Sequence, residues 1–417
     1  MARFMVVGGQ RLQGRINVSG SKNASLPILA ATLLNPGESL IHGVPQLRDV
    51  DVMCEVLQYL GARVTREGGT IRVDAGQINC WEVSEELTRK MRASNLVLGP
   101  MLGRFKKMTV SHPGGCDIGS RPMNLHLKGM TSLGARITEK FGYITAQTDI
   151  VRGAEIHLDM PSVGATENIM MAAALSKGIT RIRNAAREPE IVDLQNFLNK
   201  MGADIKGAGT DIIKIKGVSS LGSTAHTVIP DRIEAGTHMI AAAITCGDVT
   251  VANVIPEHVE SLIAKLREAG VQITVGDDTI RVSARGRPGA VDIKTLFYPG
   301  FPTDMQPQIM ALLTMADGTS IISEMVFENR YKHVSEFRRM GADIKVEGQT
   351  AIIKGVTKLS GAVVEASDLR AGAALVLAAM AADNGSVIEN IDHIDRGYEK
   401  LERKYSALGA RIIRVHS

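Results

Sequence analysis

The apolar residues of this chain follow two kinds of helical pattern. The first is apolar on nearly every side and rich in alanine, which is typical of helices that are buried all round. It occurs at residues 25–34 (SLPILAATLL), 168–178 (NIMMAAALSKG), 238–247 (HMIAAAITCG), 308–318 (QIMALLTMADG) and 373–385 (AALVLAAMAADNG). The second is amphipathic, with apolar residues three and four positions apart, as at Ile191, Leu194, Leu198 and Met201. This spacing predicts helices with one buried face.

The amphipathic pattern ends six times in a similar short motif. The motifs are YLGARV, SLGARI, KMGADI, EAGVQI, RMGADI and ALGARI, and their glycines are Gly61, Gly134, Gly202, Gly270, Gly341 and Gly409. Each glycine is expected to end its helix in a left-handed conformation. Alternating stretches such as ADIKVEGQTAIIKG follow and predict hairpins around a glycine turn. Self-similarity at one period indicates one repeated unit, here with two helices and about four short strands.

The repeats predict an α/β protein with six units. A chain of 417 residues is long enough for two domains, so we expect two lobes of three units each, with a cleft between them. The second repeat alone is longer. From Gly103, at the end of its buried helix, to Gly134 are 31 positions by subtraction, against 23 or 24 in the others. The extra residues fall in SHPGGCDIGSRP (111–122), a loop that carries Cys116. Such added loops often carry function, although a neutral insertion is the alternative.

Composition excludes several functional classes. The net charge is only +4, and no run of basic residues is interleaved with aromatic ones, which argues against nucleic-acid binding. No apolar segment approaches the length of a membrane span or of a signal peptide, so no membrane association is expected. The four cysteines, Cys54, Cys80, Cys116 and Cys246, are far apart, which suggests neither a zinc site nor a disulfide framework. A reducing cytoplasm fits this pattern.

Charged residues gather where the buried helices begin. A helix N-terminus favours anions, and Lys22, Arg92, Arg232 and Arg370 add positive charge beside four of these starts. If the starts converge on one face, that face would attract a strongly anionic substrate. Local N-capping is the simpler alternative, and it accounts well for Asp304 and Asp368.

Many of these motifs occur together in one known family. The chain resembles the UDP-N-acetylglucosamine 1-carboxyvinyltransferases, a family of enolpyruvyl transferases, over essentially its whole length. The motifs that carry the resemblance are GSKNASLP, KMRAS, PGGCDIGSRPMNLH, PSVGATEN, AAREPEIVDL, PDRIEAGTH, FPTDMQ, VFENRY, SDLRAGA and HIDRGYE. The resemblance implies a two-lobed inside-out α/β barrel fold, with helices buried and sheets outside. The implied first lobe is 22–229 and carries the Cys116 loop. The second is 1–21 plus 230–417, and the active site lies in the cleft between them.

The resemblance also implies roles for individual residues. Cys116 is the expected proton donor and can form a covalent adduct with phosphoenolpyruvate, and Asp304 is the expected base. Lys22 and Arg396 complete the expected catalytic set. The residues expected to bind phosphoenolpyruvate are Lys22, Asn23, Arg121 and Arg396. The residues expected to bind UDP-N-acetylglucosamine are Arg92, Arg121, Pro122, Met123, Asn124, Leu125, Ser162, Val163, Gly164, Asp304 and Val326. Further residues expected at the cleft are Arg232, Arg330, Asp368 and Arg370.

The implied reaction moves the enolpyruvyl group of phosphoenolpyruvate to the 3-hydroxyl of UDP-N-acetylglucosamine and releases phosphate, the first committed step of peptidoglycan synthesis. No cofactor and no metal are expected, and the antibiotic fosfomycin is the expected covalent inhibitor at Cys116. The nearest alternative is enolpyruvyl transfer to shikimate 3-phosphate, against which the Cys116 loop argues. A non-catalytic repeat clamp is the alternative from another class, and the near-neutral charge and the single insertion argue against it.

Overall fold

The protein is described by a computed structural model that covers residues 2–112, 119 and 123–416, with only the backbone of Arg92. The chain divides into two compact units. One, which we call the N-terminal unit, contains residues 20–112 and 123–229. The other, the C-terminal unit, contains residues 2–19, 119 and 230–416.

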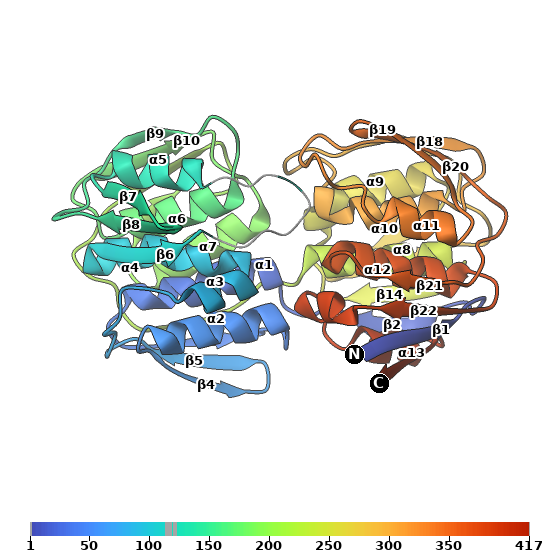
Figure 1. Ribbon diagram of the computed structural model, residues 1–417, viewed down its shortest axis with the longest axis horizontal. Coiled ribbons are helices and arrows are strands. Elements are labelled where there is room, and N and C mark those ends of the chain that lie inside the picture. The colour runs from blue at the N-terminus through green and yellow to red at the C-terminus, as the bar shows by residue number, and fades with distance from the viewer. Residues whose placement is uncertain (1, 113–118, 120–122, 417) are drawn as a thin grey trace. The chain divides into compact units, whose positions relative to one another are not determined.

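The apolar helical pattern forms the interior helices of both units, as predicted. They are α1 (Lys22–Ala31) with its extension η1 (Thr32–Leu34), α4 (Leu98–Phe105), α6 (Val163–Ala173), α8 (Arg232–Ile244), α10 (Gln306–Leu313) and α12 (Leu369–Ala381). In α12 every residue from Arg370 to Met380 is buried. Alanine is small enough to let such helices approach closely, so the three helices of a unit pack against one another (Figure 1).

The amphipathic pattern forms a second set of helices, one after each interior helix. They are α2 (Arg48–Tyr59), α5 (Asn124–Ser132), α7 (Pro189–Lys200), α9 (Glu260–Glu268), α11 (Val334–Arg339) and α13 (Leu401–Ala407). The predicted left-handed ends are confirmed, because the six motif glycines have φ values from 84° to 107°. Short helices fill the connections: α3 (Glu85–Lys90), η2 (Arg92–Val97), η3 (Pro256–Val259), η4 (Thr303–Met305) and η5 (Ile391–Arg396).

The strands of the described residues form three sheets in each unit. In the N-terminal unit the first sheet has the strand order β13 (Thr224–Thr227), β3 (Glu38–His42), β5 (Thr70–Asp74), β4 (Arg63–Glu67). The second has the order β6 (Lys107–Ser111), β8 (Tyr143–Gln147), β7 (Arg136–Lys140). The third has the order β11 (Asp204–Lys206), β12 (Ile212–Lys216), β10 (Ile179–Arg183), β9 (Glu155–His157). In the C-terminal unit the first sheet has the strand order β15 (Gln272–Val275), β16 (Thr279–Ser283), β14 (Asp248–Ala252), β2 (Gln13–Asn17). The second has the order β17 (Ile293–Lys294), β18 (Thr319–Ser323), β20 (Thr350–Lys354), β19 (Asp343–Glu347). The third has the order β21 (Val363–Glu365), β22 (Gly385–Glu389), β1 (Ala2–Val7), β23 (Arg411–His416). The sheets lie outside the helices of their unit, which makes each unit an inside-out α/β barrel (Figure 1).

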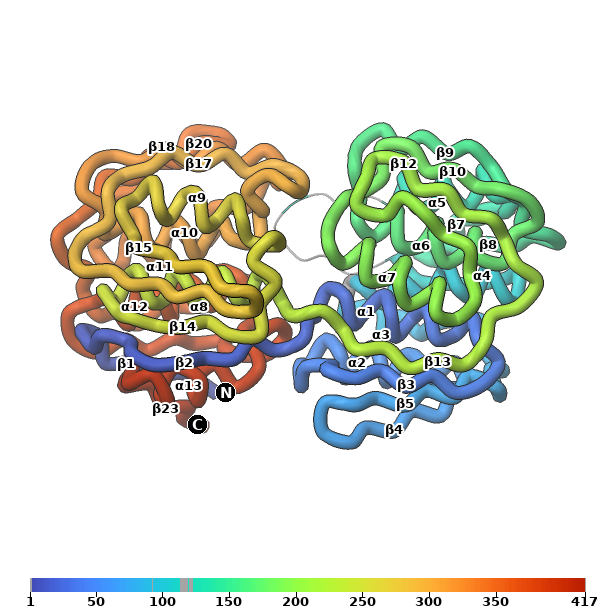
Figure 2. The backbone as a smooth tube through the Cα atoms, turned by 180° about the vertical axis from the view of Figure 1, so that it is seen from behind, coloured from blue at the N-terminus to red at the C-terminus, as the bar shows by residue number. Residues whose placement is uncertain are grey.

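The N-terminal segment completes the C-terminal unit, as the resemblance implied. Strand β1 pairs antiparallel with both β22 and β23, and so takes the place of the second hairpin strand that the sixth repeat lacks. Both ends of the described chain therefore lie in one sheet (Figure 2). Strand β2 leads into α1 of the N-terminal unit, yet it pairs with β14. Conversely, β13 leads into α8 of the C-terminal unit, yet it pairs with β3. In each unit, therefore, one sheet is completed by a strand that is followed along the chain by a helix of the other unit.

Among the described residues, no helix combines the length and the apolar character that crossing a membrane requires.

Candidate functional site

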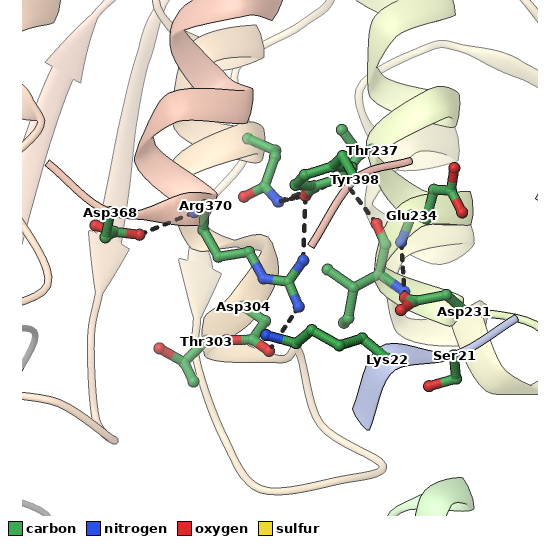
Figure 3. A network of polar contacts seen from close by, with 12 residues as sticks. Ser21, Lys22, Asp231, Glu234, Thr237, Thr303, Asp304, Asp368, Arg370 and Tyr398 are labelled. Carbon is green, nitrogen blue, oxygen red and sulfur yellow. Dashed lines mark hydrogen bonds and ion pairs between the residues drawn. The ribbon is translucent and has the colours of Figure 1, made fainter. Parts of the chain in front are cut away.

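Asp304, at the start of α10 in the C-terminal unit, lies between two buried arginines. Its Oδ1 accepts a hydrogen bond from Arg330 Nη2 at 3.4 Å. Its Oδ2 accepts one from Arg370 Nη2 at 3.2 Å (Figure 3). The two arginine side chains are 2% and 4% exposed, whereas that of Asp304 is 30% exposed. The arginines therefore fix a carboxylate that remains accessible to a ligand, through charge-assisted bonds.

Arg370 keeps its charge in spite of its burial. Burial lowers the pKa of Arg370, but Asp304, Tyr398 and Asp231 together raise it by more, and the pKa ends above its ordinary value. Arg330 also lies 4.0 Å from Asp368 Oδ1 through its Nη1. The structure therefore brings four predicted site residues together in one network of alternating charge: Asp304, Arg330, Asp368 and Arg370.

The prediction of helix caps holds for Asp368 and fails for Asp304. Asp368 accepts hydrogen bonds from the backbone N–H groups of Arg370 and Ala371, at 2.9 and 3.1 Å, and so caps α12. Asp304 lies inside the 3-10 turn η4, and neither η4 nor α10 has a side-chain cap. The reason is that its carboxylate is directed toward the two arginines, so capping does not explain this residue.

A buried glutamate that the sequence analysis missed supports this network. Glu324 follows β18 and is fully buried. It accepts hydrogen bonds from Thr303 Oγ1 at 3.0 Å and from the backbone N–H of Val326 at 2.9 Å. The Glu324 carboxylate therefore positions both Thr303, which is next to Asp304, and Val326, which is predicted to bind the sugar nucleotide. A single glutamate after a short strand gave no signal in the sequence.

Two more predicted residues of the C-terminal unit lie on neighbouring elements. Arg396 is the last residue of η5 and is half-buried. The guanidinium carbon of Arg232, the first residue of α8, lies 5.5 Å from the centre of the Tyr298 ring, a distance at which a cation and an aromatic face attract each other.

In the N-terminal unit the predicted cation at the start of α1 is buried and paired. Lys22 is 8% exposed, and its Nζ donates to Asp49 Oδ2 of α2 at 3.2 Å. Ser21 caps the same helix by accepting from the N–H of Ala24. Asn23 follows and is half-buried. A lysine that a carboxylate holds at a helix start can present charge to an anion, together with the free N–H groups of the helix.

The segments predicted to bind the sugar nucleotide are joined by a buried amide. Asn168 of α6 donates to His126 Nδ1 of α5 at 3.0 Å and to the backbone oxygen of Asn95 at 3.2 Å, and it accepts from the N–H of Gly99 at 2.6 Å. The accepted bond fixes which amide atom is oxygen, so the amide nitrogen faces His126 and neutral His126 carries its proton on Nε2. A Cβ atom on Gly164 would lie 3.1 Å from the His126 ring, so the starts of α5 and α6 touch.

The remaining predicted residues of this unit lie around these two helix starts. Ser162 caps α6 through the N–H of Ala165, and Val163 and Gly164 open the helix. Met123 precedes α5, its sulfur accepts from Asn95 Nδ2 at 3.0 Å, and Asn124 and Leu125 are the first residues of that helix. Cys116, Arg121, Pro122 and the side chain of Arg92 lie outside the described residues.

The N-terminal unit also contains a group of buried glutamates, Glu167, Glu188 and Glu190. Burial raises the pKa of Glu167 well above its ordinary value, and the nearby Glu190 and Glu188 raise it further. The Oε1 atom of Glu167 has no hydrogen-bond partner among the described residues. Within the same residues, no three histidine, cysteine, aspartate or glutamate side chains are arranged to hold a metal ion.

Several buried polar residues that contact the predicted site residues were not indicated by the sequence analysis. Tyr398, Thr237, Gln308, Glu324 and Asn168 are buried polar residues that orient the predicted ones. Thr237, Gln308 and Asn168 lie in largely apolar helices, and Tyr398 and Glu324 lie in connecting segments. Polar residues within otherwise apolar helices are the one signal that could have indicated Thr237, Gln308 and Asn168.

Comparisons with known proteins agree with this architecture. The family model described as EPSP synthase (3-phosphoshikimate 1-carboxyvinyltransferase) matches residues 6–405. An enolpyruvyl transferase of Streptomyces tendae has a similar structure, with a TM-score of 0.90 and 24% identity, covering 100% of this chain and 99% of its own. An EPSP synthase of Acinetobacter baumannii has a TM-score of 0.78 at 17% identity, with both chains fully covered. These likenesses define the enolpyruvyl transferase fold.

Relatives with a similar sequence show which group of enolpyruvyl transferases the chain belongs to. A UDP-N-acetylglucosamine 1-carboxyvinyltransferase 1 of Carboxydothermus hydrogenoformans is 58% identical, covering 100% of this chain and 99% of the relative. A UDP-N-acetylglucosamine 1-carboxyvinyltransferase of Geotalea uraniireducens is 55% identical over the full length of both chains. The chain therefore belongs to the EPSP synthase family, and within it to the group of UDP-N-acetylglucosamine 1-carboxyvinyltransferases.

Proposed function

We propose that the protein transfers the enolpyruvyl group of phosphoenolpyruvate to the 3-hydroxyl of UDP-N-acetylglucosamine, with release of phosphate, in peptidoglycan synthesis. The observation that carries the proposal is the Asp304 network. A general base must reach the proton that it abstracts and must be held in position, and Asp304 is an accessible carboxylate that two buried arginines orient. The full-length identity to relatives that carry this name supports the choice of substrates.

In the proposed mechanism, Asp304 accepts the proton of the sugar 3-hydroxyl as its oxygen attacks C2 of phosphoenolpyruvate. Cys116 gives a proton to C3, so that a tetrahedral addition product forms. This product then loses a proton from C3 and its phosphate group, which leaves the enolpyruvyl ether. The released phosphate balances the phosphate of phosphoenolpyruvate, and no cofactor is needed.

The other predicted residues fit this scheme as binding groups. Lys22, Asn23, Arg121 and Arg396 would hold the multiply charged phosphoenolpyruvate, because phosphate and carboxylate groups gain charge-assisted bonds from cations. The residues at the starts of α5 and α6, with Val326, would bind UDP-N-acetylglucosamine. We place the reaction in the cytoplasm, because neither charged substrate crosses a bilayer unaided; cell fractionation with an antibody against the protein would test this location.

The direct test is to incubate the purified protein with phosphoenolpyruvate and one acceptor at a time. Phosphate release and a product heavier than UDP-N-acetylglucosamine by the enolpyruvyl group are expected with that acceptor. Shikimate 3-phosphate and a reaction without an acceptor are the controls. Turnover with shikimate 3-phosphate in place of the sugar nucleotide would overturn the proposal in favour of the sister reaction.

The role of Cys116 can be tested in the same assay. Fosfomycin should modify Cys116 and stop phosphate release, and UDP-N-acetylglucosamine should speed the modification. We expect Cys116→Ser to be nearly inactive because a hydroxyl is a much weaker acid than a thiol, whereas Cys116→Asp should stay active and resist the epoxide. Mass spectrometry locates the adduct. An adduct at Cys54, Cys80 or Cys246, or a fully active serine variant, would contradict this role.

A further inference from the structure

One phenol connects the starts of all three interior helices of the C-terminal unit. Tyr398 follows η5 and is 1% exposed. Its hydroxyl contacts Thr237 Oγ1 of α8 at 2.9 Å, Gln308 Nε2 of α10 at 3.0 Å and Arg370 Nη1 of α12 at 3.3 Å (Figure 3). The residue therefore lies where the three helices converge, next to the network of Asp304.

The direction of these hydrogen bonds follows from the chemistry of the partners. Thr237 uses its own hydroxyl proton on the backbone oxygen of Ile233, at 2.7 Å. The phenol must therefore be the donor in its bond to Thr237. Gln308 Nε2 and Arg370 Nη1 can only donate, so the phenol oxygen accepts from both. All hydrogen-bonding positions of the hydroxyl are then occupied, and its orientation is fixed.

The phenol fixes one end of the guanidinium group whose other end holds Asp304. Arg370 donates from Nη1 to Tyr398 and from Nη2 to Asp304 Oδ2. A planar guanidinium held at two separate nitrogens has no freedom to rotate. If the phenol hydroxyl is removed, Nη1 is left unpaired in a buried place and the group can pivot about its bond to Asp304.

We infer that Tyr398 is a positioning residue for the reaction, which it serves through Arg370 by keeping the carboxylate of Asp304 in its reactive orientation. This inference rests on the proposed function, because it assigns Asp304 the role of base. Tyr398 itself does not need to touch either substrate. Its contribution should therefore appear in the rate of the chemical step and not in substrate binding.

The test uses Tyr398→Phe in the full-length protein, with phosphate release as the assay. A misplaced catalytic group can cost about 100-fold in rate, so we expect kcat to fall about 10- to 100-fold while the KM for either substrate changes little. The same substitution in an Arg370→Lys background should add almost nothing, because a lysine cannot bridge the phenol and Asp304. An unchanged kcat, or equal losses in both backgrounds, would overturn the inference.

Tyr405→Phe is the matched control. Tyr405 is also a fully buried tyrosine of the C-terminal unit, and its hydroxyl lies 3.3 Å from His238 Nδ1, in a separate network from Asp304. Both substitutions remove one buried hydroxyl, and thermal unfolding should report the larger loss of stability for Tyr398→Phe, because that hydroxyl makes three hydrogen bonds and that of Tyr405 makes one. Only Tyr398→Phe should lower kcat. A similar fall in kcat for both variants would mean that the effect is structural and would overturn the inference.

A second variant covers the case in which Tyr398→Phe does not fold. Thr237→Val keeps the shape of the side chain and removes the acceptor of the phenol proton, so a smaller fall in kcat with the same dependence on Arg370 is expected. A wild-type rate would contradict the positioning role. If the wild-type protein shows no turnover, the proposed function is wrong and this inference is wrong with it. An active wild type with unaffected variants would overturn this inference alone.

Discussion

The polar centres of the two units are built at the same repeat position and have different chemistry. Thr237, Gln308 and Asn168 each lie six positions, by subtraction, after the residue that precedes their helical segment, which is Asp231, Pro302 and Ser162 respectively. In the C-terminal unit the two residues at this position contact Tyr398, which accepts a hydrogen bond from Arg370, the partner of Asp304. In the N-terminal unit Asn168 connects only neutral groups. One scaffold therefore provides a charged network that suits proton transfer and a neutral frame that suits the fixed presentation of binding residues.

The buried glutamates show the same contrast. Glu234 of α8 accepts from His238 Nε2 at 3.2 Å, from the Ser19 backbone N–H at 2.8 Å and from Lys404. Burial raises its pKa, but His238 and Lys404 outweigh that effect and lower the pKa to about 2. Glu167 of α6 has acidic neighbours instead, and its pKa is raised. The pKa values of buried carboxyl groups are thus shifted in opposite directions in the two units.

The largest expected effect concerns Asp304. Asp304→Asn keeps the size of the side chain and removes the base, and the loss of general-base help typically costs about 10² to 10⁴ in rate. We expect this fall in kcat for phosphate release at saturating concentrations of both substrates. A rate near that of the wild type would show that the charged network has no part in proton transfer.

The next effect concerns the neutral hydrogen-bond network around Asn168. Asn168→Leu leaves the N–H of Gly99, the oxygen of Asn95 and Nδ1 of His126 without their partner, and one buried unpaired group costs about 1–3 kcal/mol. We expect a loss of roughly 2–4 kcal/mol in the free energy of unfolding of the N-terminal unit, measured with urea. Asn199→Leu, at a half-buried amide that bonds Ile205, should cost less. Equal losses would contradict the importance of the Asn168 frame.

The smallest effects concern the two buried glutamates, and they have opposite signs. Because the folded pKa of Glu234 is below its ordinary 4.5, its contribution is present above pH 4.5 and is lost as the pH falls toward 2. The folded pKa of Glu167 is raised, so its contribution is present below pH 4.5 and is lost as the pH rises. Glu234→Gln should therefore lower Tm at pH 7 and weaken the loss on acidification. Glu167→Gln should raise Tm more at pH 8 than at pH 5. Thermal unfolding measured at several pH values would refute the contrast between the two glutamates if the Tm of both variants changed with pH in the same way.

The sequence predicted the elements of the fold more completely than the contacts between them. Helix type, the glycine ends and the hairpins depend on local spacing, so the six repeats could be read directly. The exchange of β2 and β13 between the units depends on pairing across more than 180 residues, and no local pattern records it. Asp304 shows the same limit at the site: its place before an apolar helix favoured a cap, whereas the structure gives it two arginines from segments 26 and 66 residues away.

The claim that the charged network of Asp304 serves proton transfer while the hydrogen bonds of Asn168 position nucleotide-binding residues is tested most directly by calorimetric measurement of UDP-N-acetylglucosamine binding. The account predicts that Asp304→Asn binds the nucleotide within about fivefold of the wild type, which is a change of about 1 kcal/mol or less. It predicts that Asn168→Leu, once shown to be folded, binds about tenfold more weakly or worse. Strong loss of binding in Asp304→Asn together with unchanged binding in Asn168→Leu would contradict it.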